Sequence, residues 1–430
     1  ISVIVSIPPY SGGKYFPKTK KFCFKVLSIV LFIKYMKKKI DLAILCGGKG
    51  TRLKNLTRNN SKPLLKFGNN TFLEILINFY KKFNLNKIYL LVGHKSILYK
   101  KYHNKMFNFV KVECIVEKRP LGTGGAISQL KNKIKNNFIL INGDSYFEYD
   151  FLKFISSFPH KKSICKIALI KNKNYKSNKK LHCLDLDKKK RLIINNKSKY
   201  MNAGIYYFNK QIFNYIKKNR FISLEDEILP NLIKRNKIVA QKFNGFFIDI
   251  GTKKNFIFAK KNLLKKITQK CVFFDRDGVI NYDYKYVHKF NKFKFRKGVV
   301  RYLKLLNSKK IKIILITNQA GIGRGYYKEK DFYELHSNLK DYLSKNKIFI
   351  DEVYFCPHHP THAKGKYLKK CNCRKPRPGL ILKAIRENNV LEEKSFMIGD
   401  KDTDFLAAKN AKIKFYFVKE NVYEQFKKIN

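Results

Sequence analysis

Short apolar runs alternate with amphipathic stretches twice along this chain of 430 residues. The first series has an apolar run at 40–46 (IDLAILC), a glycine loop, a helical pattern at 71–83 and a second apolar run at 87–93. The second series starts with CVFFD at 271–275 and keeps the same rhythm towards the end of the chain. Alternating strands and helices are typical of a parallel sheet covered by helices. We therefore predict an α/β protein with two Rossmann-like domains.

A basic helical stretch, NLLKKITQK at 262–270, separates the two series. We therefore assign residues 38–262 to the first domain and 263–430 to the second. No internal repeat or low-complexity linker lies between them, so we expect the two domains to touch.

The segment 1–37 precedes the first expected strand, and we interpret it as an over-extended start of the chain, because Met36 stands almost directly before that strand. Its apolar run at 25–33 is too short to span a bilayer, and no small-residue cleavage site follows it. No stable membrane insertion is expected. A membrane anchor or a targeting segment is the alternative.

The formal net charge of +63 would ordinarily indicate a polyanionic partner such as nucleic acid. However, only 13 of the 93 basic residues are arginines, and the chain is rich in Lys, Asn, Ile, Phe and Tyr, the residues of A/T-rich codons. We interpret the excess as compositional drift spread over solvated faces. No nucleic-acid partner is expected.

Two carboxylates, Asp275 and Asp277 in DRDGVIN, follow directly on an apolar run. Open α/β sheets place their ligands at the carboxyl ends of strands, and two carboxylates so close together call for a cation. With Mg²⁺ neutralising both partners, Asp275 could attack a phosphate monoester as a nucleophile. A lone DxD is more often a solvated turn, but three further elements arrive in order: Thr317 with Asn318, Lys375, and Asp400.

Over residues 271–420 this set resembles the haloacid dehalogenase (HAD) superfamily of phosphatases, which implies a doubly wound parallel sheet. The resemblance implies that Asp275 forms an aspartyl-phosphate and that Asp277 acts as general acid and then base. It also implies that Mg²⁺ is held by Asp275, the backbone carbonyl of Asp277, and Asp400. Thr317 would contact the transferring phosphoryl oxygens, and Lys375 would offset their charge.

Three of the nine cysteines cluster in one basic segment. The others stand singly, and the odd total argues for a reducing, cytoplasmic compartment. A Cys-x-His pair, a 12-residue spacer and a Cys-x-Cys pair would suit a closed, structural Zn²⁺ site within 356–373. The prolines and glycine of the segment disfavour the recognition helix of a nucleic-acid finger. The four expected ligands are Cys356, His358, Cys371 and Cys373; His359 and His362 are spare candidates, interpreted as solvated loop histidines.

This loop, with TNQAGIGRGYY, CRKPRPG and IGDKDTD, resembles that of the D-glycero-D-manno-heptose-1,7-bisphosphate 7-phosphatases. The resemblance implies that Arg374 holds the sugar phosphate, for which a guanidinium is suited. The histidinol-phosphate phosphatases share the catalytic motifs and a similar zinc loop, and they are the nearest alternative. The long spacer between the ligand pairs favours the heptose substrate.

In the first series, a loop with three glycines and a Thr-Arg pair follows the strand at 40–46. Glycines let backbone N–H groups close around phosphates, and basic side chains would oppose the charge of a triphosphate. The spacing fits neither the P-loop nor the dinucleotide fingerprint. The residues concerned are Gly47, Gly48, Gly50, Thr51, Arg52 and Lys62.

With EKRPLGTGGAI, INGDSYF, MNAGIYYF and FIDIGTKKNF, this loop resembles the sugar-1-phosphate nucleotidyltransferases over residues 38 to about 260, which implies a GT-A-like sheet. The resemblance assigns the first loop to the nucleoside triphosphate. Two departures are Ser61, where the family usually has Pro, and the loose match around Lys197. The resemblance further assigns Gly122, Thr123, Gly124 and Gly125 to the base, Asp144 and Asp249 to Mg²⁺, and Asn202 and Glu225 to the sugar.

The first domain is most similar to D-glycero-α-D-manno-heptose 1-phosphate guanylyltransferases, although mannose- and glucose-1-phosphate enzymes share most of its motifs. A phosphatase that yields heptose 1-phosphate would supply such a transferase. We therefore expect a bifunctional enzyme of nucleotide-activated heptose biosynthesis, with sugar phosphates and a nucleoside triphosphate as partners. A histidinol-phosphate phosphatase fused to a mannose- or glucose-1-phosphate nucleotidyltransferase is the alternative. The oligomeric state is not indicated.

Overall fold

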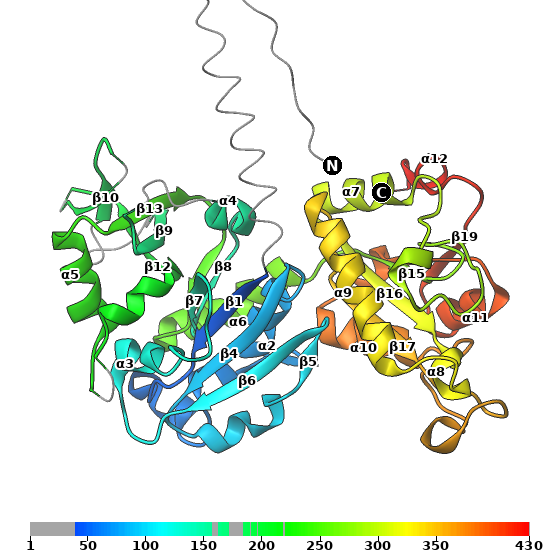
Figure 1. Cartoon of the computed structure of the whole chain (residues 1–430), viewed down its shortest axis with the longest axis horizontal. Coiled ribbons are helices and arrows are strands. Elements are labelled where there is room, and N and C mark those ends of the chain that lie inside the picture. The colour runs from blue at the N-terminus through cyan, green and yellow to red at the C-terminus, as the bar shows by residue number, and fades with distance from the viewer. Residues whose placement is uncertain are drawn as a thin grey trace, which may run out of the picture.

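The computed structural model describes residues 39–156, 162–171, 184–189, 191–195, 197–217 and 220–429. The segment 1–37, with the apolar run inside it, lies outside the described residues. Within the described ranges, no helix combines the length and the apolar character needed to cross a membrane. Two bodies lie next to each other, one coloured blue to green and the other yellow to red (Figure 1).

The N-terminal body is built on a 10-stranded sheet of the described strands. Strand β1 (Ile40–Leu45) is parallel to β4 (Leu85–Val92) on one side and to β7 (Phe138–Asn142) on the other. The loops that follow β1 and β7 therefore leave the same edge of the sheet. The remaining strands of this sheet are β5 (Met106–Phe107), β6 (Val110–Val116), β9 (Cys165–Lys171), β10 (Leu184–Leu186), β11 (Leu192–Ile194), β12 (Tyr200–Phe208) and β13 (Ile238–Phe243).

Apolar side chains of β1 alternate between two cores. Leu42 and Ile44 enter the core that contains α2 (Phe72–Tyr80) and α6 (Lys253–Ile267). Ala43 enters the core on the other face, which contains α3 (Gly122–Ser128) and α5 (Leu229–Lys234). Since successive strand residues point to opposite faces, helices cover both sides of the sheet. The predicted helix at 71–83 is confirmed as α2, which begins at a Thr71–Glu74 capping box.

The C-terminal body contains a five-stranded sheet, in the order β17-β16-β15-β18-β19, and all of its neighbouring pairs are parallel. Val272 and Phe274 of the central strand share a core with α7, α9 and α12, whereas Cys271 and Phe273 share one with α10 and α11. Helices therefore flank both faces, and the predicted α/β fold is confirmed. The strands are β15 (Cys271–Phe274), β16 (Lys312–Asn318), β17 (Glu352–Cys356), β18 (Phe396–Gly399) and β19 (Lys414–Phe417), and the helices are α7 (Val299–Ser308), α8 (Ala320–Arg324), α9 (Glu329–Lys345), α10 (Gly379–Asn388), α11 (Asp402–Asn410) and α12 (Val422–Phe426).

Shorter elements connect these layers. Two two-stranded sheets stand apart from the main one, and several single helical turns bound the loops. The strands are β2 (Lys66–Phe67), β3 (Asn70–Thr71), β8 (Ser145–Phe147) and β14 (Phe247–Asp249); the helices are α4 (Phe151–Ile155), η1 (Thr51–Thr57), η2 (Lys62–Leu64), η3 (Ser96–Tyr102), η5 (Lys210–Asn214), η6 (Leu224–Ile228), η7 (Phe290–Lys292), η8 (Gly365–Tyr367) and η9 (Glu392–Lys394).

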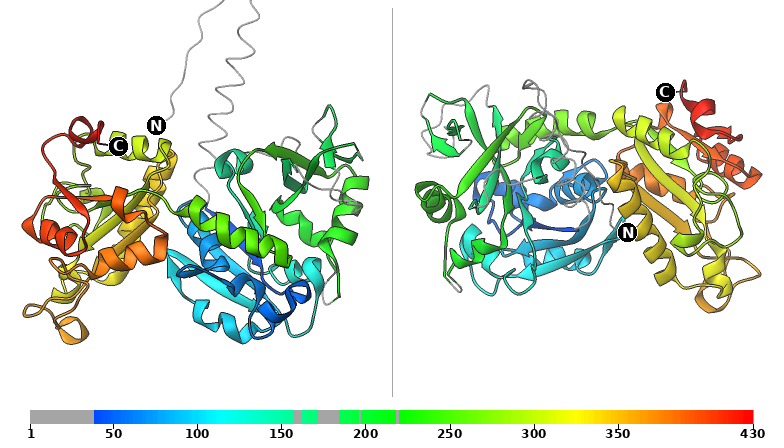
Figure 2. Two further views of the ribbon diagram at one scale, coloured as in Figure 1. Left: turned by 180° about the vertical axis from the view of Figure 1, so that it is seen from behind. Right: turned by 45° about the horizontal axis from the view of Figure 1, so that its top comes forward.

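Helix α6 leads from the first body to the second. From behind, it lies over the N-terminal sheet, close to the junction (Figure 2). Leu263 and Ile267 are buried in the N-terminal core, so a boundary after residue 262 cuts through this helix. We place the division between Ile267 and Cys271, where the first strand of the second sheet begins.

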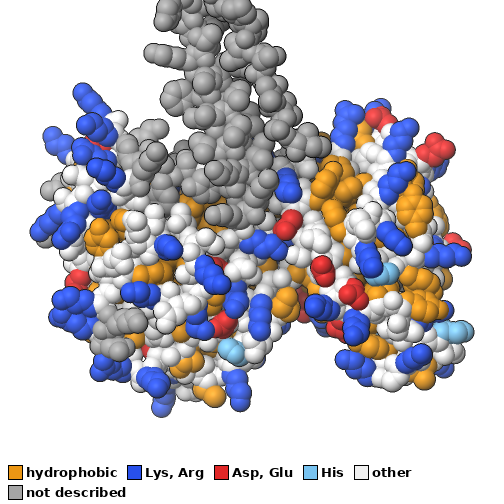
Figure 3. Space-filling view, viewed as in Figure 1, with side chains coloured by type: hydrophobic (Ala, Val, Ile, Leu, Met, Phe, Trp, Pro, Cys, Tyr) orange, Lys and Arg blue, Asp and Glu red, His pale blue; other side chains and the backbone are white. Residues whose placement is uncertain are grey.

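The two bodies touch through polar and aromatic contacts. Lys81, just after α2, donates to Glu352 of β17 and to Asn388 of α10. Asn108, in the turn between β5 and β6, donates to the carbonyl oxygen of Ile350 over 2.8 Å. Lys and Arg side chains are scattered over the face shown in Figure 3, and they do not gather in one patch there.

Candidate active sites and metal cluster

The carboxyl ends of three adjacent strands meet at one site in the C-terminal domain. Asp275 follows β15, Thr317 lies near the end of β16, and Asp400 follows β18. Lys375 comes from the loop before α10 and is 3% exposed. The structure therefore brings together four residues that the sequence placed in separate motifs, at the edge where open α/β sheets bind ligands.

Lys375 is held between two carboxylates. Its Nζ lies 2.8 Å from Asp275 Oδ1 and 2.6 Å from Asp404 Oδ1, and it also donates to the carbonyl oxygen of Ile316. Burial lowers the pKa of Lys375, but the two carboxylates outweigh it and leave the pKa above its ordinary value. Burial likewise raises the pKa of Asp275 to about 7, although Lys375 opposes that rise. The lysine therefore stays charged beside Asp275.

Asp404 is a functional residue that sequence reasoning missed. It is fully buried in the first turn of α11, and its Oδ2 accepts from the backbone N–H groups of Asp400 and Lys401. A Cβ at Gly399 would lie 2.4 Å from the Asp404 Cβ, so the glycine makes room for this side chain. The signal in the sequence was the last Asp of GDKDTD.

Three carboxylates could hold a cation here. Oxygens of Asp275, Asp400 and Asp404 all lie within 4.8 Å of one another. Asp400 Oδ1 is buried and has no hydrogen-bond partner among the described residues, and hard cations such as Mg²⁺ favour such oxygens. Gly278, at φ +93°, lies against this site, because a Cβ there would approach Asp400 Oδ2 to 2.1 Å.

The Asp277 side chain lies outside this group of three. Its carboxylate accepts from Arg276 Nη2 at 2.7 Å, from Asn281 Nδ2 at 3.0 Å and from Gln319 Nε2 at 2.9 Å. Burial raises the pKa of Asp277, but Arg276 and the two amides outweigh burial and bring the pKa below its usual value. The carboxylate of Asp277 is therefore engaged by its neighbours and is not one of the three that lie close enough together to hold a cation. Sequence reasoning missed Arg276, Asn281 and Gln319.

The loop after β16 ties the site together. Gln319 Nε2 donates to Thr317 Oγ1 as well as to Asp277, and Tyr327 donates to Gln319 Oε1. Asn318 accepts from the backbone N–H of Lys375 and donates to its carbonyl oxygen, each over 3.1 Å. We expected Asn318 to contact the substrate, but both polar atoms of its side-chain amide bond to the backbone of Lys375.

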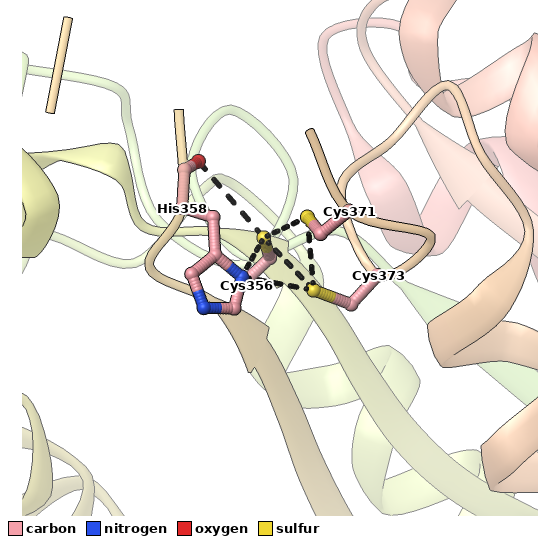
Figure 4. Close-up of side chains that lie close together, drawn as sticks. All are labelled: Cys356, His358, Cys371 and Cys373. Carbon is pink, nitrogen blue, oxygen red and sulfur yellow. Dashed lines mark hydrogen bonds between the residues drawn. The ribbon is translucent and has the colours of Figure 1, made fainter. Parts of the chain in front are cut away.

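The four expected zinc ligands form one cluster (Figure 4). Sulfur–sulfur distances are 3.6 Å for Cys356–Cys371, 3.3 Å for Cys356–Cys373 and 3.2 Å for Cys371–Cys373. His358 Nδ1 lies 3.2 Å from Cys373 Sγ. Sulfurs about 2.3 Å from one tetrahedral centre would lie roughly 3.7 Å apart, so the sulfurs need to move apart only slightly to form a Zn²⁺ shell.

The cluster adjoins the segment that carries Lys375. Arg374 Nη1 donates to the carbonyl oxygen of His358 over 3.3 Å, and Cys356 ends β17. His359 is partly buried and His362 is exposed; they are hydrogen-bonded to each other and to Thr361, and they are not in the group of four.

In the N-terminal domain, Asp144 and Asp249 lie next to each other. Asp144 immediately precedes β8 and Asp249 ends β14, two strands that pair antiparallel and set Asp249 opposite Ser145. Burial, and then the Asp144 carboxylate, raise the pKa of Asp249. Lys62 Nζ lies 2.8 Å from Asp144 Oδ2. The lysine predicted to bind the triphosphate therefore forms an ion pair with an aspartate predicted to bind Mg²⁺. The loop with Gly47, Gly48, Gly50, Thr51 and Arg52 leaves the end of β1, at the edge from which Asp144 also comes.

The second glycine loop is built against the chain before η6. Gly122 has φ +72°, and a Cβ there would lie 2.5 Å from the carbonyl oxygen of Ile222. Thr123 Oγ1 donates to Glu225 over 2.7 Å, and Gly124 N–H donates to the Ile222 oxygen. Gly125 lies within the same turn. A predicted base loop and a predicted sugar ligand are thus linked by one hydrogen bond.

The remaining residues singled out in this domain differ in burial and in their hydrogen-bond partners. Asn202 accepts from Gly204 N–H and donates to Tyr206 Oη over 2.7 Å. Ser61 is buried, and its hydroxyl lies 2.7 Å from Tyr99 Oη, which gives a partner to the residue that departs from the family pattern. Lys197 is exposed in a turn between β11 and β12. Glu117, which accepts from Leu121 N–H, was not expected at the site.

Comparisons with known proteins agree with both sites. Residues 42–266 match the family described as Nucleotidyl transferase, and residues 372–428 match the one described as HAD-hydrolase-like. The chain is 44% identical over 146 residues to a D-glycero-beta-D-manno-heptose-1,7-bisphosphate 7-phosphatase of Pasteurella multocida, a match that covers 34% of this chain and 79% of the relative. For the phosphatase of that name from Helicobacter pylori strain 26695, the identity is 48%, with 34% and 82% covered.

A crystal structure of HddC from Yersinia pseudotuberculosis is 29% identical and covers 52% of this chain and 99% of its own, with a TM-score of 0.43. The family matches and the phosphatase relatives occupy different parts of the chain, one for each site described above. The chain is therefore a two-domain enzyme that belongs to the nucleotidyl transferase family in its N-terminal half and to the HAD-like heptose-bisphosphate phosphatases in its C-terminal part.

Proposed function

We propose that the C-terminal site removes the 7-phosphate of D-glycero-D-manno-heptose 1,7-bisphosphate and that the N-terminal site joins the resulting heptose 1-phosphate to GMP from GTP. The observation that carries this proposal is the union of the two families in one chain: relatives named as heptose-1,7-bisphosphate 7-phosphatases match the second domain, and the nucleotidyl transferase family matches the first. The product of one reaction is then the substrate of the other.

In the phosphatase, Asp275 attacks the 7-phosphorus and forms an aspartyl-phosphate, while the P–O bond to the sugar breaks. The negative charge of the bound phosphate favours the protonated form of Asp277, and Asp277 gives that proton to the departing oxygen. It then takes one from the water that hydrolyses the aspartyl-phosphate. Mg²⁺ bound by Asp275 and Asp400 would offset the negative charge of nucleophile and phosphate. Lys375 supplies a fixed positive charge beside Asp275, and Thr317 donates to a phosphoryl oxygen. Arg374 holds the distant sugar phosphate.

In the transferase, the phosphate of heptose 1-phosphate attacks the α-phosphorus of the triphosphate, and pyrophosphate leaves. No protein nucleophile is needed, so the domain acts through position and charge. The loop from Gly47 to Arg52 binds the triphosphate together with Lys62. Asp144 and Asp249 would hold Mg²⁺, which would offset the negative charge of the triphosphate. The loop from Gly122 to Gly125 holds the base, and Asn202 and Glu225 hold the sugar. GTP as donor rests on the resemblance of this domain to heptose guanylyltransferases.

We further propose that the Cys/His cluster holds one structural Zn²⁺. Three thiolates and one imidazole are a closed donor set with no place for substrate. All cysteines in the described part of the chain are free thiols, which supports a reducing, cytoplasmic environment.

Two assays on the purified full chain test these assignments. With Mg²⁺, phosphate release from heptose 1,7-bisphosphate should exceed release from histidinol phosphate; the opposite preference would overturn the heptose assignment. The heptose 1-phosphate so formed is then offered a panel of four nucleoside triphosphates, and pyrophosphate release should be fastest with GTP. Faster turnover of mannose or glucose 1-phosphate would overturn the second assignment.

A further inference from the structure

The turn between β5 and β6 reaches from the transferase domain onto the phosphatase domain, where it lies beside α9 (Figure 1). Asn108 anchors it through Ile350 on the other side of the junction, and Lys340 of α9 donates back to the Asn108 carbonyl oxygen over 3.2 Å. Phe109, the next residue, therefore has a fixed place in the interface.

Phe109 sits at φ +64°, directly after Asn108 at φ +43°. Two consecutive left-handed residues in a hairpin turn normally favour Asn-Gly, because glycine carries no Cβ. A phenylalanine at the second position is strained, and such outliers persist where the side chain has another use. Glycine would suit the backbone of this turn better than phenylalanine, so we expect a contact of the Phe109 ring outside the turn.

The ring of Phe109 packs on α9. It stacks on His336 with centroids 5.2 Å apart, and it lies 6.1 Å from the ring of Phe332. Phe332 belongs to a small apolar cluster with Ile322 and Tyr327, against which Phe109 also packs. We call these four residues, Phe109 included, the α9 cluster. One of its members thus comes from the other domain.

The α9 cluster backs the residues that hold Asp277. The guanidinium of Arg276 lies over the Phe332 ring, 5.7 Å from its centroid. Arg276 is fully buried and binds both oxygens of Asp277. Tyr327, from the same cluster, donates to Gln319, which in turn donates to Asp277. Two of the three side chains that hold this carboxylate therefore rest on the cluster.

We propose that Phe109 is a positioning residue for the phosphatase reaction: from the transferase domain, it completes the α9 cluster and so holds Arg276 and Gln319 where they orient Asp277. Proton transfer from Asp277 to the oxygen that leaves phosphorus needs that orientation, since a general acid acts only within hydrogen-bond reach of its target. The inference rests on the proposed role of Asp277 as general acid.

The proposal is tested by measuring, on the full chain, how phosphatase activity depends on the leaving group of the substrate. An alkoxide such as the sugar oxygen needs a proton as the P–O bond breaks, whereas p-nitrophenolate leaves well without one. We expect Phe109→Gly to lower kcat/KM for heptose 1,7-bisphosphate about tenfold, a part of the roughly 100-fold or greater effect of general acids. Its kcat/KM for p-nitrophenyl phosphate should change less than about twofold, because that reaction does not need the acid. Glycine suits the turn, so the variant should fold, and nucleotidyl transfer should be unchanged.

Two variants serve as controls. Phe109→Tyr keeps the ring and should restore kcat/KM for heptose 1,7-bisphosphate. Lys310→Ala removes an interdomain ion pair with Glu148 that does not touch α9, and it should leave both phosphatase substrates unaffected. A Phe109→Gly variant with wild-type kinetics, or one equally slow on both phosphates, would overturn the proposal.

Asp277→Asn separates this result from the proposed function. If Asp277→Asn hydrolyses the heptose substrate at the wild-type rate, the general-acid assignment itself is wrong. If Asp277→Asn is inactive on that substrate while Phe109→Gly behaves as wild type, only the positioning role of Phe109 is overturned.

Discussion

Lys81 Nζ of the transferase domain lies 2.6 Å from Glu352 Oε2 of the phosphatase domain. Lys81 is 2% exposed and Glu352 is 9% exposed, and Asn388 Oδ1 accepts a further hydrogen bond from the lysine over 3.1 Å. A buried charge is costly unless it is paired and hydrogen-bonded. The pair therefore ties the two domains together in one arrangement.

Lys81→Met should destabilise the full chain by about 3–5 kcal/mol, because it leaves the Glu352 carboxylate buried without a counter-charge. Denaturant unfolding monitored by fluorescence and by loss of phosphatase activity measures the change. Lys81→Met combined with Glu352→Leu should recover most of that loss, since an apolar pair can replace a buried ion pair. Equal destabilisation in the single and double variants would contradict this account.

Lys340 should make stability depend on pH. Its ammonium donates to the carbonyl oxygens of Lys81 and Asn108, and burial lowers its pKa to about 7, although Glu352 opposes that change. Between pH 7 and the ordinary pKa of a lysine, the Lys340 side chain is protonated in the unfolded chain and largely neutral in the folded one. The unfolded chain therefore binds more protons, and stability rises with pH. The slope should stay below about 1.4 kcal/mol per pH unit, the limit for one proton.

The measurement compares denaturant midpoints of wild type and Lys340→Met at several values between pH 7 and 8.5. Subtracting the variant's stability from that of the wild type at each pH cancels the effect of groups present in both proteins. These include the buried thiols, whose pKa burial raises. Parallel curves would show that Lys340 keeps its proton when the chain is folded.

Residues that directly follow apolar strands could be placed from the sequence. Asp275 and Asp400 each end a strand of one parallel sheet, and parallel strands bring such ends to one edge. Asp144 and Asp249 are found together for a similar reason, although their strands, β8 and β14, pair antiparallel.

Side chains that act through tertiary contacts could not be placed in this way. Asp404 lies in a polar helix turn, and only the fold brings it to Lys375. Arg276 stands between two aspartates, which reads as a solvated charge, yet the structure buries it completely. Phe109 in MFNFV looks like any hairpin residue; its contact with α9 depends on how two separate domains dock.

Gly122→Ala should abolish most nucleotidyl transfer. The residue has φ +72°, and the new Cβ would lie 2.5 Å from the Ile222 carbonyl oxygen, so the loop must move and disturb the hydrogen bond from Thr123 to Glu225. Such strain is of the order of 1–3 kcal/mol, which corresponds to roughly a 5- to 150-fold loss of kcat/KM. Pyrophosphate release measures it, and phosphate release by the other domain of the same protein should remain normal. Loss of both activities would point to unfolding instead.

Cys371→Ser should remove the metal from the Cys/His cluster. It takes away one of the four donors, each of which lies within 4.8 Å of the other three, and closed zinc sites depend on a complete set. Elemental analysis of freshly purified protein should give about one Zn²⁺ per wild-type chain and much less for the variant. Thr361→Ala, in the same loop but outside the cluster, should keep its zinc. Wild-type protein purified without bound metal would argue for four free side chains.

Asp404→Asn should slow the phosphatase about 100-fold, in the range seen when one electrostatic contact of a catalytic site is removed. The amide still offers an oxygen to the N–H groups of Asp400 and Lys401, so the helix start is preserved, but Lys375 loses one of its two carboxylates. The Lys375 ammonium is then paired with Asp275 only, and it is no longer held in position beside the phosphate. Asp402→Asn makes the same chemical change at an exposed position of the same turn, so it should leave phosphate release unchanged. Equal rates for the two variants would mean that Asp275 suffices to hold the lysine.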